Sequence, residues 1–280
     1  MTDELDVLNV SALEDGRYGA PHPTTDPEGR NVVFSGQVMA QKIMAASHAS
    51  NDKEVKSIHT IFARSGNYDS PLELELENMH TGRAWASHSI TASQGGRLLS
   101  RSLVLMSSVE PDLIRNVPEM PDVPGPDSQH TGGFLLLFPG LTALTVNAPH
   151  ATAPDGTPVE YYWMKYRHPV ESVAKNQAVL AWSQPGMIIG LALRPHASKV
   201  SISDAHVSIS TGVISHTAHF HEHFDVGDWL LVVQNNGYAG HGRLYGSGSV
   251  FRKDGTLVST FGQDSMARGA EAPLDRRRSM

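Results

Sequence analysis

The feature that most constrains the fold of this chain is an internal repeat. The stretch GRAWASHSITASQGG, which begins at Gly82, aligns without a gap with GRLYGSGSVFRKDGT, which begins at Gly242. The identical pairs are Gly82 and Gly242, Arg83 and Arg243, Ser87 and Ser247, Ser89 and Ser249, and Gly95 and Gly255. Composition alone does not readily produce these matches together with a shared turn signal, so the chain is interpreted as one structural unit written twice.

Both halves show the same order of secondary-structure patterns. Helical spacing of apolar and small residues predicts a helix over residues 34–50 and another over residues 172–193, where Pro185 should kink or end it. Strand-like segments separated by turn signals follow each helix, at residues 55–66, 72–80, 83–96 and 97–108 and again at 215–224, 229–236, 242–255 and 256–268. The sequence therefore predicts an α+β fold in which each unit has one long helix and an antiparallel sheet.

A segment rich in proline and glycine separates the two units. Residues 111–133, PDLIRNVPEMPDVPGPDSQHTGG, contain five prolines and three glycines and show no sustained apolar period. The predicted organisation is an N-terminal unit over residues 1–110, a linker over 111–133, a C-terminal unit over 134–270 and a short basic tail over 271–280. We expect the linker to be exposed and the two units to pack through their sheets.

Composition excludes several classes of function. The chain of 280 residues has a formal charge of -7, which argues against nucleic acid as the main ligand because phosphate backbones are held by basic surfaces. It has no cysteine, so disulfides and a thiol nucleophile are excluded. No apolar run approaches the roughly 18 residues of a membrane span. The acidic N-terminus lacks the basic region of a secretory signal, and a cytoplasmic location is expected.

The segment SHTAHFHEHFD, residues 215–225, contains four histidines. If it is a strand throughout, His219, His221 and His223 line one face and His216 points to the other. A structural zinc site needs four ligands, usually including cysteine, and this chain has none. An ordinary half-exposed strand without a metal is therefore the favoured interpretation.

Several stretches resemble one family in their order and spacing. They are VFSGQVMAQ, SIHTIFARSG and GRAWASHSITASQGGR in the first half, and LALRPHA, FHEHFDVGDWLLV and FRKDGTLVSTFGQDSMAR in the second. Together they resemble the type II acyl-CoA thioesterases, which fuse two hotdog domains in one polypeptide. The resemblance covers nearly the whole chain and implies a double hotdog, a long helix wrapped by a curved antiparallel sheet in each half. It also implies hydrolysis of fatty acyl-CoA by an activated water, without a cofactor.

The resemblance implies that an Asp, a Ser or Thr and a Gln of the second half position the water. Gln263 matches the glutamine. Ser215 stands where the aspartate is expected, and the hydroxyl position falls in QNNGYAG, where Asn236 is the candidate. His216, beside Ser215, is a candidate general base because a neutral imidazole can accept a proton near neutral pH. The alternative is that His216 only forms a structural hydrogen bond.

Three residues of the first half are candidates for substrate binding. Gly36 and Gln37 begin the predicted helix, where backbone amides can face the thioester oxygen. The alternative there is simply a packed helix start. His59 matches a histidine of the family, although a lone histidine among apolar residues is more often part of the core.

Two other functions remain open at this point. A degenerate member of the family would bind acyl-CoA or another acyl thioester without efficient hydrolysis, because the aspartate position is serine. A hotdog hydratase is ranked last, since the Gly-Asp-x-Asn-Pro motif of such enzymes does not occur. Hotdog units generally pair, so a homo-oligomer is expected by analogy.

Overall fold

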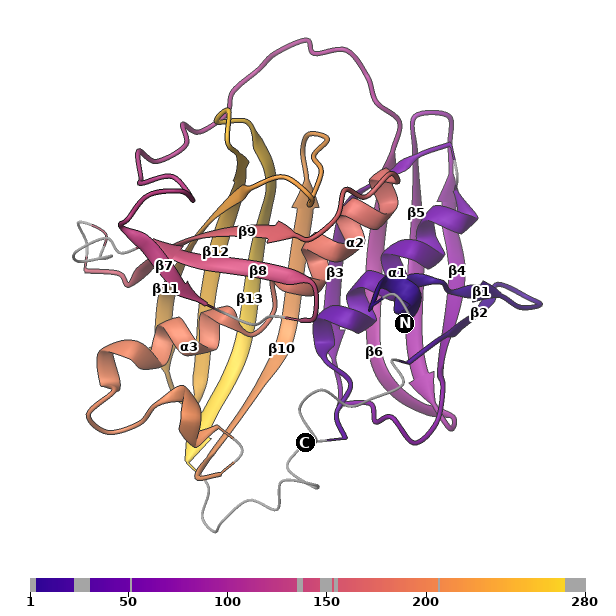
Figure 1. Ribbon diagram of the computed structural model, residues 1–280. Coiled ribbons are helices and arrows are strands. Elements are labelled where there is room, and N and C mark those ends of the chain that lie inside the picture. The colour runs from indigo at the N-terminus through magenta and orange to yellow at the C-terminus, as the bar shows by residue number, and fades with distance from the viewer. Residues whose placement is uncertain are drawn as a thin grey trace.

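The computed structural model describes residues 4–22, 31–50, 52–134, 138–146, 153, 156–205 and 207–269. The basic tail predicted over residues 271–280 lies outside them. The described strands form a single antiparallel sheet in which the N-terminal half lies on the right and the C-terminal half on the left of Figure 1. The strand order across this 13-stranded sheet is β1-β2-β4-β5-β6-β3-β10-β13-β12-β11-β9-β8-β7.

The N-terminal half contains the predicted helix and four strands in the predicted order, preceded by three short elements that were not predicted. In chain order, this half contains the 3-10 helix η1 (Glu4–Leu8), the strands β1 (Ser11–Ala12) and β2 (Arg17–Ala20), the helix α1 (Ser35–Ala49), and the strands β3 (Glu54–Phe62), β4 (Leu72–Thr81), β5 (Trp85–Gln94) and β6 (Arg97–Ser107). In β4 the stretch LELE alternates between buried leucines and exposed glutamates, as expected of a strand with one face in water.

The C-terminal half repeats this order with additional elements. It contains β7 (Thr131–Phe134), β8 (Leu141–Val146), β9 (Val159–Tyr166), α2 (Val173–Ser183), α3 (Met187–Leu193), the 3-10 helices η2 (Arg194–His196) and η3 (Ile202–Asp204), and the strands β10 (Ile209–Phe220), β11 (Leu230–Gly240), β12 (Arg243–Arg252) and β13 (Leu257–Gly269). Sequence analysis did not identify β8 and β9. Among the described residues, no helix is long and apolar enough to cross a membrane.

The repeat is confirmed by the topology of the sheet. Strands β4, β5, β6 and β3 are neighbours in that order, and β11, β12, β13 and β10 repeat the order from the other edge. Gly95 and Gly255, which the repeat aligns, both have positive φ angles, 56° and 90°, in the corresponding turns. The double hotdog fold is therefore the observed architecture. The two units join edge to edge, because β3 pairs with β10 and makes the sheet continuous.

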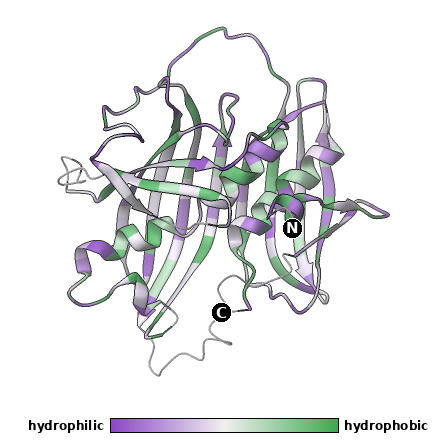
Figure 2. Ribbon diagram, in the orientation of Figure 1, coloured by the Kyte–Doolittle hydropathy of each residue, from purple (hydrophilic) through white to green (hydrophobic). Residues whose placement is uncertain are grey.

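The two central helices lie side by side on one face of the sheet (Figure 1). Gly36, in the first turn of α1, is a position where a side chain is excluded, because a Cβ atom there would lie 2.2 Å from the carbonyl oxygen of Trp182 near the end of α2. The start of α1 therefore meets the end of α2, and the helices are antiparallel. Figure 2 shows hydrophobic residues on both helices and in alternation along the strands. One hydrophobic core includes buried residues of both halves, such as Met39, Ile58 and Tyr162.

The ends of α2 follow from local chemistry. Ser172 caps its first turn, where the side chain accepts from the backbone N–H of Lys175 at 3.4 Å. The helix ends at Ser183, before Pro185, and Gly186 has a φ of 99° that only glycine adopts readily. The chain then resumes as α3. The prediction that Pro185 ends or kinks the second helix is confirmed.

Two regions differ from the predicted pattern. Strand β10 ends at Phe220, so the prediction of a strand through His223 is wrong. The backbone N–H of His221 still donates to Val258 of β13 at 2.9 Å, and the chain then turns away from the strand. There the carboxylate of Asp225 accepts from the backbone N–H groups of Val170 and Gly227. The segment between the units is exposed at residues 109–119, whereas Met120 and Val123 pack against the second half. Strand β7 already begins at Thr131, and the proposed unit boundaries stay a prediction.

Candidate functional site

The candidate residues of β10 and β13 lie on opposite faces of the sheet. In the register of the two strands, Ser215 is paired with Asp264 and His216 with Gln263. Because successive side chains of a strand alternate, one pair faces the helices and the other faces outward. The structure therefore separates Ser215 from Gln263, although sequence analysis assigned both to one site.

A buried hydrogen-bonded cluster lies on the helix side. The ring Nδ1 of His216 is 3.1 Å from Oε1 of Gln263, and its Nε2 is 3.1 Å from Oε1 of Gln184. The amide Nε2 of Gln263 donates to Oγ of Ser265 at 2.8 Å. Gln184 is the C-cap residue of α2, so the helix end positions it over β10. We call Gln184, His216, Gln263 and Ser265 the inner polar cluster; all four are buried.

His216 is a neutral imidazole at neutral pH. Burial lowers its pKa to about 4, and the hydrogen bond that Oε1 of Gln263 accepts from the ring opposes this only in part. A neutral ring has one N–H, so one of the two carboxamides must present its NH₂ group to the other ring nitrogen. Both NH₂ groups have a serine acceptor, Ser265 for Gln263 at 2.8 Å and Ser259 for Gln184 at 3.4 Å. Because the contact of Gln184 is the longer one, Gln184 is the carboxamide that can more easily turn its NH₂ group to the ring. The ring of Phe261 stacks on His216 at a centroid distance of 5.7 Å and excludes water from that side.

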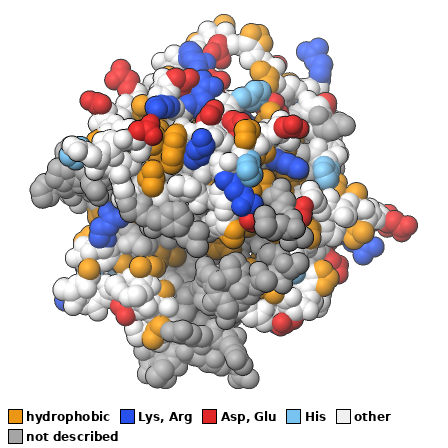
Figure 3. Space-filling model, viewed as in Figure 1, with side chains coloured by type: hydrophobic (Ala, Val, Ile, Leu, Met, Phe, Trp, Pro, Cys, Tyr) orange, Lys and Arg blue, Asp and Glu red, His pale blue; other side chains and the backbone are white. Residues whose placement is uncertain are grey.

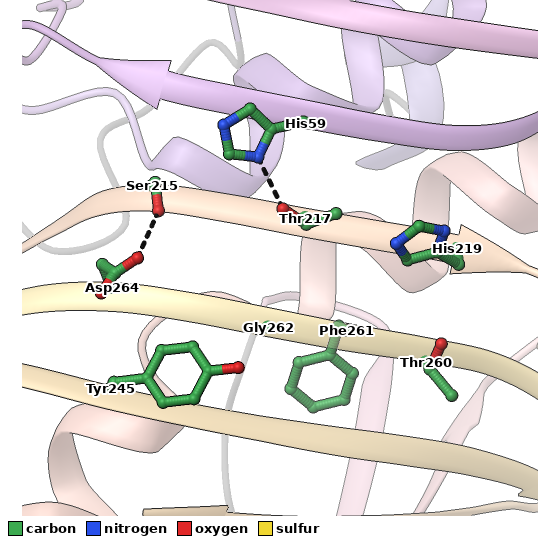
Figure 4. A pocket seen from close by; sticks show the side chains of 9 residues that line it. All are labelled: His59, Ser215, Thr217, His219, Tyr245, Thr260, Phe261, Gly262 and Asp264. Carbon is green, nitrogen blue, oxygen red and sulfur yellow. Dashed lines mark hydrogen bonds between the residues drawn. The ribbon is translucent and has the colours of Figure 1, made fainter. Parts of the chain in front are cut away.

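A shallow depression of about 300 Å³ lies on the outer face, between β3, β10, β13 and β12 (Figure 4). Here Oγ of Ser215 donates to Oδ2 of Asp264 at 3.0 Å, and Nδ1 of His59 lies 2.6 Å from Oγ1 of Thr217. Figure 4 shows these as two separate pairs, with no contact drawn between Ser215 and His59. The arrangement does not connect a serine nucleophile to a base, and the depression is too open to exclude water from a reacting thioester.

Asn236 lies in the same cross-strand row as the inner polar cluster. It is paired with Gly246 of β12, and Gly246 is paired with Gln263 of β13. The side-chain NH₂ of Asn236 donates to the backbone carbonyls of Tyr238 and Tyr245, at 3.1 and 2.9 Å, and so supports the bulge in β11. Gly246 has no side chain between them, and a Cβ there would lie 2.6 Å from a methyl group of Ile188. Asn236 is therefore near the cluster but is occupied by backbone contacts.

At the start of α1, the N–H groups of Gln37 and Val38 both donate to the carbonyl of Phe34. These two amides are therefore occupied, and a role of this helix start in substrate binding stays a prediction. Gly36 allows the backbone of α1 to lie close to the carbonyl of Trp182, because it has no side chain. The side chain of Gln37 is different, because it is 1% exposed and its Nε2 has no hydrogen-bond partner among the described residues. Phe34, the N-cap residue of α1, lies beside Gly186, because a Cβ atom built on Gly186 would be 3.7 Å from the ring of Phe34. The first turn of α1 therefore lies beside the end of α2.

Sequence analysis missed Gln184 and Ser265. A carboxamide directly before a predicted helix break at Pro185 was the signal that could have identified Gln184. Ser265 could be identified only with the register of β13, two residues beyond Gln263. His59 was assigned to substrate binding together with Gly36 and Gln37, but it is exposed on the outer face.

The other histidines of residues 215–225 do not point toward one common centre. Nε2 of His221 lies 2.9 Å from Oγ1 of Thr260, and Nε2 of His223 lies 2.7 Å from a carboxylate oxygen of Glu54. Within the part of the chain that the structure describes, no group of three or more His, Asp or Glu side chains could hold a metal ion. The rings of His219 and His221 stack at a centroid distance of 6.5 Å.

Comparison with known proteins shows similarity along both halves. The family model described as the N-terminal domain of acyl-CoA thioesterase matches residues 22–108, and the model described as the C-terminal domain matches residues 115–267. These two matches cover most of the chain and meet at the segment between the two units.

Individual relatives extend over nearly the full chain. Acyl-coenzyme A thioesterase 8 of Homo sapiens is 25% identical over 288 residues, which cover 94% of this chain and 88% of that protein. Acyl-CoA thioesterase 2 of Haemophilus influenzae is 26% identical over 264 residues, covering 87% of this chain and 90% of that protein. The structure of the acyl-CoA thioesterase II TesB2 from Mycobacterium marinum has a TM-score of 0.81 and 22% identity, covering 95% of this chain and 98% of that chain, and supports the fold.

Proposed function

The chain belongs to the acyl-CoA thioesterase family, and from this premise we propose that it hydrolyses a fatty acyl-CoA to a free fatty acid and CoA at the inner polar cluster. The observation that supports this site is the neutral ring of His216, held between two carboxamides beneath the end of α2. Hydrolysis needs a positioned water, donors for the developing oxyanion and a surrounding that excludes bulk solvent.

The cluster can meet these needs through its amides. The water oxygen forms a bond to the thioester carbon, and the negative charge passes to the carbonyl oxygen. As the tetrahedral intermediate collapses, the C–S bond breaks, and the proton that the water loses passes to the departing CoA thiolate. A base with a pKa of about 4 is weak at neutral pH, so we propose that His216 chiefly orients the carboxamides and the water. Nε2 of Gln37, a buried donor without a partner among the described residues, is the proposed donor to the oxyanion.

A matched pair of substitutions tests which face of the sheet is catalytic. Gln263 and Asp264 are neighbours on β13, and their side chains face the inner cluster and the outer depression respectively. Release of free thiol from acyl-CoA should fall by about 10²-fold or more in Gln263→Ala, the usual effect of losing one positioned donor. Asp264→Ala should retain turnover, because its side chain contacts only the outer face.

The other outcomes are equally informative. Loss of turnover in Asp264→Ala alone would move the reaction to the outer depression, with Ser215 and His59. Binding of acyl-CoA by the wild-type protein without release of CoA at any chain length would favour the binding-only alternative, which no observation now supports. Turnover that is indifferent to both changes would place the reaction elsewhere.

Three wider features of the function are also proposals. We propose a role in fatty acid metabolism, since the relatives are acyl-CoA thioesterases. The cytoplasm is the proposed location, to be tested by fractionation of cells that express the protein. A homo-oligomer is proposed from the general pairing of hotdog units, and light scattering of the purified protein tests it.

A further inference from the structure

The outer face of the sheet, opposite the helices, has a central region of mostly uncharged side chains. The pairing of β5, β6, β3, β10, β13 and β12 aligns its residues in three cross-strand rows. The rows are Thr91, Arg101, Ile61, Ser215, Asp264 and Tyr245; Ser89, Leu103, His59, Thr217, Gly262 and Ser247; and Ser87, Leu105, Ser57, His219, Thr260 and Ser249. We call these positions the outer patch. Arg101 and Asp264 are the only Lys, Arg, Asp or Glu residues in it.

Three aliphatic side chains of the outer patch are exposed next to one another. Ile61, Leu103 and Leu105 have exposed fractions of 55%, 53% and 37%. Leu103 and Leu105 are two residues apart on β6, so both point to the same face. Ile61 of β3 lies diagonally from Leu103, because their direct partners are Arg101 and His59. The three side chains therefore form one continuous apolar area on central strands of the sheet.

Other parts of the surface differ from this area. On the C-terminal half, Met120 and Val123 of the segment between the units pack against Leu231 and Phe251, which the alternation of β11 and β12 places on the same outer face. Figure 3 shows the side of the molecule that carries the helices, where basic and acidic side chains are interspersed over the described surface. An uncovered apolar area with few charges is typical of a surface that binds another protein.

The outer patch contains both a projecting side chain and a depression of suitable position. The depression over β3, β10, β13 and β12 lies within the patch, and Figure 4 shows Gly262 in it, between Thr217 and Tyr245. A Cβ atom built on Gly262 would have only the ring of Tyr245 within 4 Å, at 3.5 Å, so the depression is open here. Leu103 is the direct neighbour of His59 and Gly262 that of Thr217, and His59 pairs with Thr217 at the junction of the halves. Leu103 and Gly262 therefore occupy symmetric positions about this junction.

The two charged residues of the outer patch have the same relation. Arg101 of β6 and Asp264 of β13 lie in one row, each one strand away from the junction of β3 and β10. Nε of Arg101 donates to Oγ1 of Thr91 at 3.1 Å, and Asp264 accepts from Ser215 at 3.0 Å. Within the described part of the chain, neither residue forms an ion pair. Both charges are exposed and can pair with a partner.

A twofold axis that runs along the junction, between two sheets packed face to face, exchanges these symmetric positions. Each Arg101 then lies opposite the partner's Asp264, and each Leu103 lies opposite the partner's Gly262. A twofold axis across the strands through the same row would instead place each Arg101 on the partner's Arg101, which like-charge repulsion disfavours. We propose that the outer patch binds a second copy of this chain about the first axis, with each Leu103 seated in the partner's depression. This proposal assigns a surface to the homo-oligomer and does not depend on the proposed hydrolysis.

Charge reversal tests the proposed pairing. Arg101→Asp and Asp264→Arg each place like charges at two symmetry-related contacts, and each should raise the Kd of the dimer by about 10²-fold, roughly tenfold for each contact. An equimolar mixture of the two variants should form dimers again, because the heterodimer has opposite charges at both contacts. Sedimentation velocity over a range of protein concentrations measures the Kd in each case. Lys199→Glu, a charge reversal at an exposed lysine outside the outer patch, is the control and should change the Kd by less than about twofold.

A second pair of variants tests the apolar contact. Leu103→Lys should weaken the dimer by about tenfold or more, because the side chain no longer fits the partner's depression. Leu113→Lys changes a residue that is 96% exposed between the two units and should leave the dimer unaltered. Three results would overturn the proposal: wild-type protein that is monomeric up to about 100 μM, a dimer that neither charge reversal weakens, and a mixture of the two charge variants that stays monomeric. Absent hydrolysis by an intact dimer would count against the proposed function alone.

Discussion

The two halves place different polar clusters on corresponding strands beneath their central helices. Under α1, the ammonium group of Lys42 donates to the hydroxyls of Ser100 and Ser102, at 2.8 and 2.9 Å, and Ser102 is 2.8 Å from Oγ1 of Thr60. Under α2, the ring of His216 lies between the carboxamides of the inner polar cluster. The strands correspond, because β3 and β6 in one half match β10 and β13 in the other. Thr60 and His216 are even direct partners across the junction.

The difference shows how, in a duplicated fold, the polar cluster of one half can have a structural role while that of the other half carries out the reaction. Burial lowers the pKa of Lys42 to about 7, with a further contribution from Arg101, and hydroxyl groups alone receive its protons. The His216 cluster instead contains carboxamides, which can both donate and accept, and it lies at the end of α2. We interpret the first cluster as structural and the second as the site of hydrolysis.

The largest expected contrast is in catalytic rate. His216→Leu should lower kcat by about 10²- to 10⁴-fold, the usual effect of losing a group that positions or transfers a proton. Lys42→Met should keep kcat within about tenfold, because no step of the proposed reaction involves the amine. Steady-state hydrolysis of one acyl-CoA by both variants checks this. A comparable loss in Lys42→Met would show that the two halves share the reaction.

The contrast between the halves was only partly predictable from the sequence. The repeat, both central helices and eight of the strand segments follow from periodicity and turn signals, because these are local properties. The face of a side chain depends on register, and Ser215 and Gln263 occupy different faces because β10 pairs residue 215 with residue 264. Gln184 reaches His216 only through the packing of α2 on the sheet, a tertiary contact between residues 32 positions apart.

The second contrast is the response to acid. The pKa of His216 is about 4 in the folded protein against 6.5 for the unfolded group, so the unfolded chain binds more protons between these values. Stability therefore falls as pH decreases from about 7 to 4, by about 3 kcal/mol for this group. Urea denaturation at pH 7, 5.5 and 4 should show a steeper loss in the wild type than in His216→Leu. Equal slopes in both proteins would mean that the ring is not held neutral by burial.

The change in stability above pH 7 should depend on Lys42 in the N-terminal half and not on His216 in the C-terminal half. The pKa of Lys42 is about 7 when folded and 10.5 when unfolded, so the unfolded chain again binds more protons in between. Stability should rise from pH 7 to 9 by about 2 kcal/mol through this amine. The same denaturation series on Lys42→Met should lack this rise. His216→Leu still contains Lys42 and should retain the rise, because His216 titrates below this range. A rise that persists in Lys42→Met would have to come from another group.

The smallest expected effect concerns the junction between the halves. Thr217 of β10 lies opposite His59 of β3, and their side chains are 2.6 Å apart on the outer face. Thr217→Val removes this exposed hydrogen bond and should lower the free energy of unfolding by about 1 kcal/mol. The five residue pairs between β3 and β10, the packing of α1 on α2 and the shared core remain, so unfolding should stay a single transition. Circular dichroism and tryptophan fluorescence, followed together through denaturation, check both points. Two separate transitions in Thr217→Val would mean that the halves are joined mainly by the outer face, and a large loss of turnover would contradict a catalytic site on the helix side.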